Sequence, residues 1–267
     1  MRLSKVARAI LWTIMGFGFS FIYVPLILVI INSFNQSTSF AWPPSGYTTQ
    51  WWSKATGNEG VRDALSRSIQ VAFFATLIAL LLGSLAAAAI ARYKFFGRDA
   101  ISLLFVLPIA LPGIVTGIAL NNVFTNFLGE LTIFTIIVGH ATFCIVVVFN
   151  NVAARYRRLG ANLEEASMDL GANRWTTFRL VTFPLIRTAL IAGGLLSFAL
   201  SFDEIIVTTF TAGAGQNTLP IWIFQNLFRP NQAPIVNVVA ATLVILSIIP
   251  IYLSQRLSSD NASGGRF

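Results

Sequence analysis

The chain has 267 residues, of which 55% are hydrophobic and only 10% are charged, and its formal net charge is +8. Soluble domains carry roughly 25% charged residues, so this composition excludes a soluble globular fold and indicates an integral membrane protein. Nucleic-acid binding would need a clustered basic surface, which the sequence lacks, and the single cysteine, Cys144, excludes an internal disulfide and predicts no metal site.

Six apolar segments are long enough to cross a bilayer, for which a helix needs about 20 residues. In chain order we expect spans at residues 10–31, 67–91, 100–122, 131–152, 188–209 and 236–255. The first is interpreted as an uncleaved span, because its apolar run exceeds that of a signal peptide and no small-residue cleavage site follows. The third contains Pro108 and Pro112, which predict a kink. The expected fold class is an all-α polytopic membrane protein with six transmembrane helices.

The basic residues predict the orientation of these spans. Fourteen of the 18 Lys and Arg residues fall on one side, and Lys54, Arg62, Arg67 and Arg229 fall on the other. Under the positive-inside rule the richer side is cytoplasmic, which places both termini in the cytoplasm. The loop from about 153 to 187 is then the longest cytoplasmic connection.

The longer external loops, residues 32–66 and 210–235, contain several tryptophans. Such residues suit the membrane interface, and the alternative is a docking surface for an extracytoplasmic partner. The tryptophans concerned are Trp42, Trp51, Trp52 and Trp222.

The segment LEEASMDLGANRWTTFRLVTFPLI (163–186) is the polar part of the cytoplasmic loop. We predict a first helix with Asn162 as its N-cap and with Glu164 and Glu165 in its first turn, where the helix dipole favours carboxylates. Gly171 is expected to end this helix in the left-handed conformation. A second helix should begin near residue 174, and Pro184 should mark the return to the membrane.

The first of these helices has a narrow apolar stripe formed by Leu163, Ala166 and Leu170. Helices that lie on lipid headgroups usually carry basic residues on their polar face, whereas this face is acidic and includes Asp169. We therefore expect the helix to insert into a groove of another protein, with the stripe as its anchor.

Seven positions in this segment resemble the EAA loop of permease subunits of ABC importers. They are Glu165, Ala166, Ser167, Gly171, Val181, Phe183 and Pro184, with mild departures at Ser167 and Phe183. In that family the loop forms coupling helices that sit in a groove of the ATPase subunit. The resemblance thus implies a set of ATPase-coupling residues: Glu164, Glu165, Ala166, Ser167, Asp169, Leu170, Gly171 and Pro184.

The resemblance extends over nearly the whole chain to the C-type permease subunits of spermidine/putrescine importers and their relatives. Stretches in matching order and spacing carry it: NSFN (32–35), GYTTQWW (46–52), RYKFFG (92–97), GHATFC (139–144), EASMDLGA (165–172), LSFDEIIVTTF (200–210) and TLP (218–220). It implies the type I importer fold, with one permease domain over residues 1–267 in the bacterial inner membrane. The partners it implies are a second permease subunit, homologous or identical, a pair of ATP-binding subunits and an extracytoplasmic solute-binding protein.

We expect no enzyme activity and no cofactor in this chain. It lacks the G-x4-G-K-[S/T] loop that cradles phosphates, so ATP and Mg²⁺ belong on the partner ATPase. The alternative to an ATP-driven importer is an ion-gradient-driven secondary transporter of small amines. A scaffold or sensor without transport is a further rival, but it leaves the EAA spacing unexplained.

Asp203 and Glu204 lie within the fifth expected span, about 24 Å along a hydrocarbon core of about 30 Å. A carboxylate inside the membrane costs about 2.5–3.5 kcal/mol on insertion scales, so it should face an aqueous path or a partner. The pair is either a cation-attracting station on a translocation path or a structural pair that caps a helix or binds Arg67 or Arg229. Neighbours on a helix point about 100° apart, and we favour Asp203 for the path.

The substrate class is left open between a polyamine and a related small cationic or zwitterionic amine. Polyamine permeases of this type often have an acidic residue after the proline of the third span, where this chain has Pro112 and Gly113. Asn121 is a candidate for a neutral contact on the path, with a helix-end role as the alternative, and Trp51 is the candidate from the outer loops. His140, in the fourth span, is interpreted as hydrogen-bonded structure.

Overall fold

The computed structural model describes residues 4–38, 42–160, 162–229 and 231–246, and the regular secondary structure in these ranges is entirely helical. The elements are α1 (Lys5–Asn32), α2 (Gln50–Gly57), α3 (Glu59–Arg92), α4 (Arg98–Ala110), α5 (Gly113–Leu128), α6 (Ile133–Leu159), α7 (Asn162–Asp169), α8 (Arg174–Thr177), the π-helical turn η1 (Phe178–Thr182), α9 (Phe183–Phe202), α10 (Ile206–Thr211), α11 (Leu219–Asn226) and a helix at Ala233–Leu246. Four helical stretches in the described ranges are long and apolar enough to cross a membrane: α1, α3, α6 and the continuous helix Arg174–Phe202. An all-helical protein with membrane-spanning helices is thereby confirmed.

One of two compact units comprises residues 1–62 and 223–267. In it, α1 covers the first predicted span and begins after Ser4, whose hydroxyl accepts the Ala7 N–H at 3.1 Å. None of the residues of α1 is buried within this chain. The helix Ala233–Leu246 is the described part of the last predicted span, 236–255, and the rest of that span lies outside the described residues.

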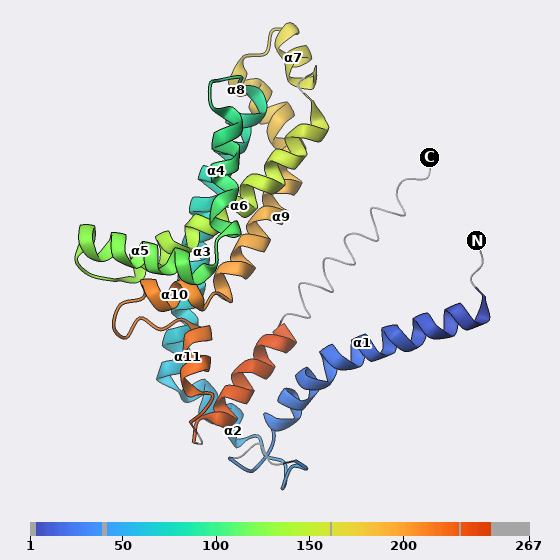
Figure 1. Cartoon of the computed structure of the whole chain (residues 1–267), viewed down its shortest axis with the longest axis vertical. Helices are drawn as coiled ribbons and strands as arrows, with labels where there is room; N and C mark the ends of the chain where they lie inside the picture. The colour runs from blue at the N-terminus through green and yellow to red at the C-terminus, as the bar shows by residue number, and fades with distance from the viewer. Residues whose placement is uncertain (1–3, 39–41, 161, 230, 247–267) are drawn as a thin grey trace. The chain divides into compact units, whose positions relative to one another are not determined.

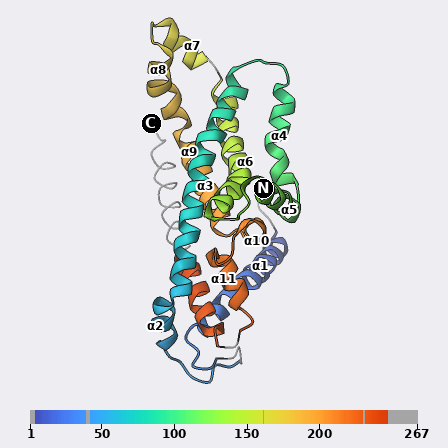
Figure 2. The ribbon, with the colours of Figure 1, turned by 90° about the vertical axis from the view of Figure 1, so that its left-hand side faces the viewer.

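The other unit, residues 63–222, is built around α6, which packs against α9 and α3. Figures 1 and 2 show these three helices running side by side. Their contact is made largely by small residues, and Cys144 is one of the fully buried ones. A Cβ on Gly83 of α3 would lie 2.8 Å from the carbonyl oxygen of Ile145 on α6. The backbones therefore approach as closely as small residues allow in membrane helix bundles.

The third predicted span, 100–122, is not one kinked helix but two, and that prediction was wrong. The chain leaves α4 at Leu111, which has φ −80° and ψ 143°, and starts α5 after Pro112. The cause is local, because a proline ring disfavours the helical conformation of the residue before it and has no N–H to continue the helix. Figures 1 and 2 show α5 turning away from α4.

The fifth predicted span, 188–209, is also interrupted. Helix α9 ends at Phe202, Asp203 is its C-cap, and α10 begins at Ile206. The carboxylate of Glu204 accepts the Val207 N–H at 2.9 Å and so caps the new helix. The expectation that Asp203 and Glu204 are neighbours on one helix, pointing 100° apart, was therefore wrong.

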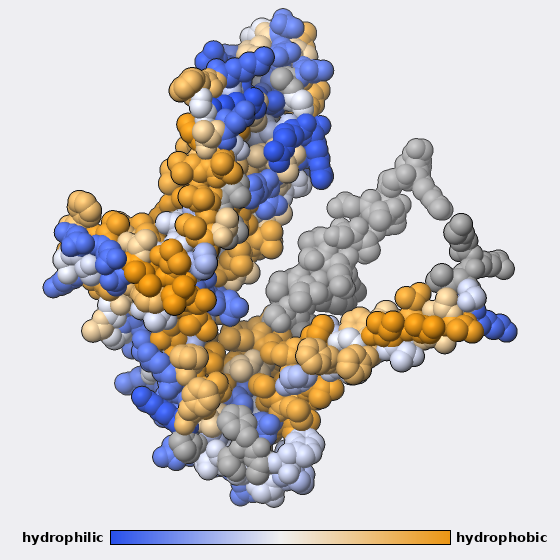
Figure 3. All heavy atoms as spheres, viewed as in Figure 1, coloured by the Kyte–Doolittle hydropathy of each residue, from blue (hydrophilic) through white to orange (hydrophobic). Residues whose placement is uncertain are grey.

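The unit of residues 63–222 has apolar sides and one polar end. Figure 3 shows apolar residues over the sides of α4, α6 and α9 and hydrophilic residues gathered around α7 and α8. The predicted coupling segment thus forms the polar end of an apolar bundle, opposite the end where α9 meets α10.

Candidate functional site

The predicted coupling segment folds as a helix, a turn and a second helix, as expected. Gly171 has φ +88°, its N–H donates to the Met168 carbonyl at 2.9 Å, and the Ala172 N–H donates to the Ser167 carbonyl at 3.2 Å. These two bonds are the Schellman arrangement that ends a helix on a left-handed glycine. Asn162 is the first residue of α7 itself, one position further into the helix than the N-cap role we predicted.

The second helix begins with a side-chain cap and continues into the membrane helix. Asn173 accepts the Thr176 N–H at 2.8 Å, which starts α8. Five residues of π-helix follow, and the Phe183 N–H reaches back to the Phe178 carbonyl. A wide turn at this point accommodates Pro184, which has no N–H to donate to the preceding turn. Pro184 therefore marks a change of helix type within one continuous helix.

The apolar stripe of α7 faces away from the bundle. The exposed fraction is 51% for Leu163 and 91% for Leu170, and Ala166 between them is also exposed. Glu165 and Asp169 are exposed on the same short helix. Exposed leucines next to exposed carboxylates are typical of a surface that binds a partner, and not of a protein core.

Glu164 points the other way and fastens α7 to the bundle. One carboxylate oxygen lies 2.8 Å from Nε of Arg92, and the other accepts from an Arg92 terminal nitrogen at 3.0 Å and from the Thr182 hydroxyl at 2.9 Å. The Arg92 guanidinium also stacks 4.9 Å from the ring centre of Tyr156. This cluster of Arg92, Tyr156, Glu164 and Thr182, which we name the anchor cluster, joins the ends of α3 and α6 to α7 and η1.

The eight predicted coupling residues thus divide into two groups. Glu164 and Ser167 face the protein itself, and the Ser167 hydroxyl lies 3.1 Å from that of Thr177. The other six are exposed: Glu165, Ala166, Asp169, Leu170, Gly171 and Pro184. A cleft of about 380 Å³ runs beside the anchor cluster and is lined by charged side chains that include Glu165 and Arg174.

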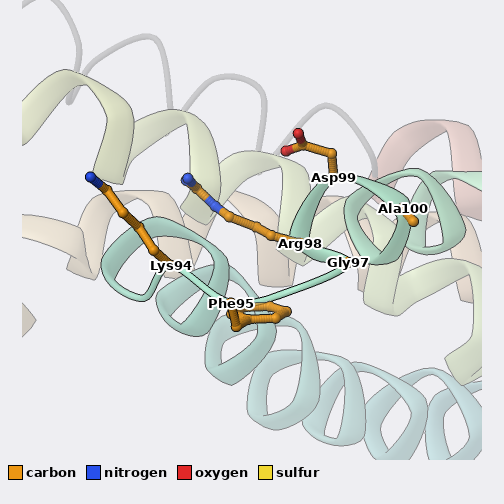
Figure 4. A pocket seen from close by; sticks show the side chains of 6 residues that line it. All are labelled: Lys94, Phe95, Gly97, Arg98, Asp99 and Ala100. Carbon is orange, nitrogen blue, oxygen red and sulfur yellow. The ribbon is translucent and has the colours of Figure 1, made fainter.

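A second polar feature lies in the loop between α3 and α4. The side chains of Lys94 and Arg98 extend in the same direction beside a shallow pocket of about 320 Å³ (Figure 4). Arg98 Nε donates to the Ile90 carbonyl at 2.7 Å, which ties the start of α4 to the last turn of α3. Gly97 makes the turn between them with φ +80°. None of the predicted site residues lines this pocket.

The predicted substrate-path residues do not form one cluster. Asp203 is exposed at the turn between α9 and α10, while Glu204 is partly buried in its capping role. The amide nitrogen of Asn121 on α5 donates to the Phe210 carbonyl at 2.6 Å, which gives Asn121 a structural bond to α10. Trp51 belongs to the other unit, where it is buried and donates its indole N–H to the Asn35 carbonyl at 2.9 Å.

Within the described residues neither Asp203 nor Glu204 forms an ion pair with an arginine, which was the alternative role for this pair. Arg67 donates to the Gly215 carbonyl at 2.7 Å, and among the described residues the ion pair formed is that of Arg92 with Glu164. In the described part of the chain Glu204 caps a helix with its side chain, whereas Asp203 occupies the C-cap position of α9 with its backbone N–H bonded to the Ala199 carbonyl. Asp203 therefore keeps an exposed carboxylate with no charged partner in the described part of the chain.

The sequence analysis did not predict two sets of contacts that hold α7 and the α9–α10 turn in place. The anchor cluster depends on Arg92, which lies 72 positions before its partner Glu164, a separation at which no periodic pattern exists. His140 was expected to be hydrogen-bonded, but its partners Ser201 and Thr208 were not predicted. A signal for that contact was present, because a lone histidine in an apolar span must find polar partners on neighbouring helices.

Comparison with known proteins gives consistent matches. Residues 79–262 match the model of the protein family described as binding-protein-dependent transport system inner membrane component. The chain is 34% identical over 247 residues to the spermidine/putrescine transport system permease protein PotC of Escherichia coli K12, covering 92% of both proteins. It is 32% identical over 251 residues to the putrescine transport system permease protein PotI of the same organism, covering 90% of this chain and 88% of PotI.

The fold has a close counterpart among solved structures. A chain in the crystal structure of a bacterial ABC transporter involved in the import of the acidic polysaccharide alginate superposes with a TM-score of 0.72. The superposition covers 97% of this chain and 99% of the other, at 16% sequence identity. At that identity the match describes the fold.

Proposed function

This chain belongs to the family of binding-protein-dependent transport system inner membrane components, and from that premise we propose that it imports polyamines or a related small amine as one permease subunit of an ATP-driven complex. The proposed partners are a pair of ATP-binding subunits, a second permease subunit, homologous or identical, and an extracytoplasmic solute-binding protein. ATP and Mg²⁺ are held by the ATP-binding subunits. The chain crosses the inner membrane six times, with both termini in the cytoplasm.

The outward stripe of α7 is the observation that carries the proposal. Leu163 and Leu170 present apolar surface at the polar end of the bundle, where a lipid-facing helix would instead carry basic residues. An ATP-binding subunit with an apolar groove and a basic rim suits this surface, because the stripe would fill the groove while Glu165 and Asp169 met the rim.

The anchor cluster gives the proposed contact a mechanical consequence. A force on α7 passes through Glu164 to Arg92 on α3, and through the guanidinium to Tyr156 on α6. A second route is continuous backbone, because the helix that starts at α8 runs to Phe202. Closure of the ATP-binding subunits would thereby shift the end of the bundle where Asp203 lies, and the membrane core would switch between two states.

For the substrate we propose that Asp203 attracts an ammonium group on the translocation path. Asp203 is exposed and has no charged partner within the described ranges, which supports this role over Glu204, whose carboxylate accepts the Val207 N–H. The names of the relatives PotC and PotI support a polyamine, whereas Pro112 and Gly113, at the place where an acid was expected, favour a substrate with fewer charges. Asn121 and Trp51 belong to the path only as neutral supporting residues, because both have structural partners.

The test is putrescine uptake by cells that express this chain with its partner genes and have no other polyamine importer. We expect Glu165→Lys to abolish ATP-driven uptake, because it reverses the charge of the docking helix, while the protein level in the membrane stays unchanged. The matched control is Glu130→Lys, the same change at an exposed glutamate in the loop between α5 and α6.

Co-purification of the ATP-binding subunit gives the second readout, and it should fall with Glu165→Lys and not with the control. Normal uptake and normal co-purification in both variants would overturn the coupling assignment. Uptake that survives loss of the ATP-binding subunit and stops when the proton gradient collapses would identify an ion-gradient-driven transporter instead.

A further inference from the structure

His140 on α6 is fully buried and forms a hydrogen bond with each of its ring nitrogens. Nδ1 lies 2.7 Å from the hydroxyl oxygen of Ser201, and Nε2 lies 2.7 Å from that of Thr208. Ser201 is in the last turn of α9 and Thr208 is in α10. One side chain therefore spans the break between the two helices from a third helix.

The direction of these bonds follows from the proton count at Thr208. Its hydroxyl donates its single proton to the Glu204 carbonyl at 2.8 Å, so it can only accept from His140. The imidazole therefore carries its proton on Nε2, and Nδ1 accepts from the Ser201 hydroxyl. The result is a directed chain from Ser201 through His140 and Thr208 to the backbone of Glu204.

The same turn is closed from its other side by Glu204 itself. Its carboxylate accepts the Val207 N–H, while its carbonyl accepts from Thr208. Both polar ends of Glu204 are therefore engaged, and the preceding residue, Asp203, is the exposed one. The three residues Ser201, His140 and Thr208, which we name the clasp, therefore bond to the same turn in which Glu204 is engaged and Asp203 is exposed.

We propose that His140 is a positioning residue for substrate recognition: by clasping the turn between α9 and α10 it holds Glu204 in its capping role and presents Asp203 to a cationic substrate. This inference rests on the proposed function, because it assigns a role in transport through Asp203. It does not require His140 to touch the substrate.

The first measurement is hydrogen–deuterium exchange of the purified transport complex, read on peptides that contain residues 203–209. We expect Thr208→Val to speed exchange there by about two- to tenfold more than the control does, the range expected from losing the hydrogen bond to His140, while Thr208→Ser stays near the parent. The matched control is Thr209→Val. Its hydroxyl also donates to a backbone carbonyl of the turn, that of Ile205, at 2.7 Å, but it does not touch His140.

The second measurement is putrescine uptake in a double-mutant series. Thr208→Val and His140→Leu should each lower uptake when Asp203 is present and should have little further effect in an Asp203→Asn background, because both act through that carboxylate. His140→Gln, which keeps one donor and one acceptor, should recover part of the loss.

The two measurements separate the ways in which the inference can fail. Unchanged exchange in Thr208→Val overturns the clasp. Faster exchange with uptake losses that add to those of Asp203→Asn overturns the positioning role. Normal uptake in Asp203→Asn, with uptake by the complex still dependent on ATP, shows that the substrate-path assignment is at fault.

Discussion

Asp203 and Glu204 are adjacent acidic residues with different surroundings. The proposed substrate path rests on this difference. Glu204 uses its carboxylate on a backbone N–H at the start of α10, a role that any acceptor oxygen of similar reach can fill. Asp203 is exposed and has no charged partner among the described residues. Charge should therefore matter at Asp203 and hydrogen-bonding capacity at Glu204.

The roles of Asp203 and Glu204 can be distinguished by replacing each acid with its neutral amide. Asp203→Asn should lower putrescine uptake by about 10- to 100-fold, the range expected from losing a hydrogen bond to a charged group, at an unchanged protein level. Glu204→Gln keeps an acceptor for Val207 and should lower uptake by less than about threefold, the cost of weakening one cap. Initial uptake rates normalised to immunoblots check both, and equal losses at the two sites would argue for a structural role of the pair.

The elements differ in how far the sequence predicts them. Long apolar runs such as α1, α3 and α6 are recognisable because burial in lipid demands uninterrupted hydrophobicity over a whole span. The breaks at Leu111 and after Phe202 could not be placed, since hydropathy does not distinguish one helix from two short ones. Pro112 indicated the first break, but we interpreted it as a kink within one helix. The second break lies where Glu204 caps α10 and where His140 of α6 bonds to both α9 and α10, and the sequence does not say which residues His140 meets.

The same limit applies to the predicted coupling helix. Its existence, its glycine stop and its outward apolar stripe could be predicted, because all three are encoded within ten residues of α7. The inward direction of Glu164 could not, because it depends on Arg92 in a distant helix. Of the substrate-path residues, the sequence distinguished Asp203 only weakly, and it did not reveal the structural bonds of Asn121 and Trp51.

The salt bridge of the anchor cluster provides a test at the level of elements. Glu164→Arg alone should uncouple ATP hydrolysis from uptake, because it places two like charges at the junction of α3 and α7. Adding Arg92→Glu should restore part of the coupling by reversing the pair. The measurement is the ratio of putrescine transported to ATP hydrolysed in reconstituted vesicles. A double variant no better than the single one would show that the pair does not transmit force.

At the scale of the whole molecule, the proposed topology follows from the distribution of Lys and Arg and from the polar end around α7 and α8. It assigns α7 to the cytoplasm and the α5–α6 loop to the outside. The interrupted third and fifth spans make this assignment worth testing directly, because two short helices need not cross the membrane as one long helix does.

Cysteine labelling in whole cells checks this topology. Leu170→Cys should react with a membrane-impermeant maleimide only after the cells are permeabilised, whereas Glu130→Cys should react in intact cells. The native Cys144 is fully buried and provides a low background, which the parent protein measures. Labelling of position 170 in intact cells would reverse the proposed orientation.

The wide turn before Pro184 leaves the helix from Arg174 to Phe202 as one rod of 29 residues. At 1.5 Å per residue it is about 43 Å long, so a tilt of roughly 10° about its α8 end would move the far end by roughly 7 Å. If the same helix moved along its own axis instead, its two ends would move by the same distance. If α7 docks on an ATP-binding subunit as proposed, tilting would convert a small rocking of that subunit into a larger movement at the far end, with every hydrogen bond of the helix kept intact.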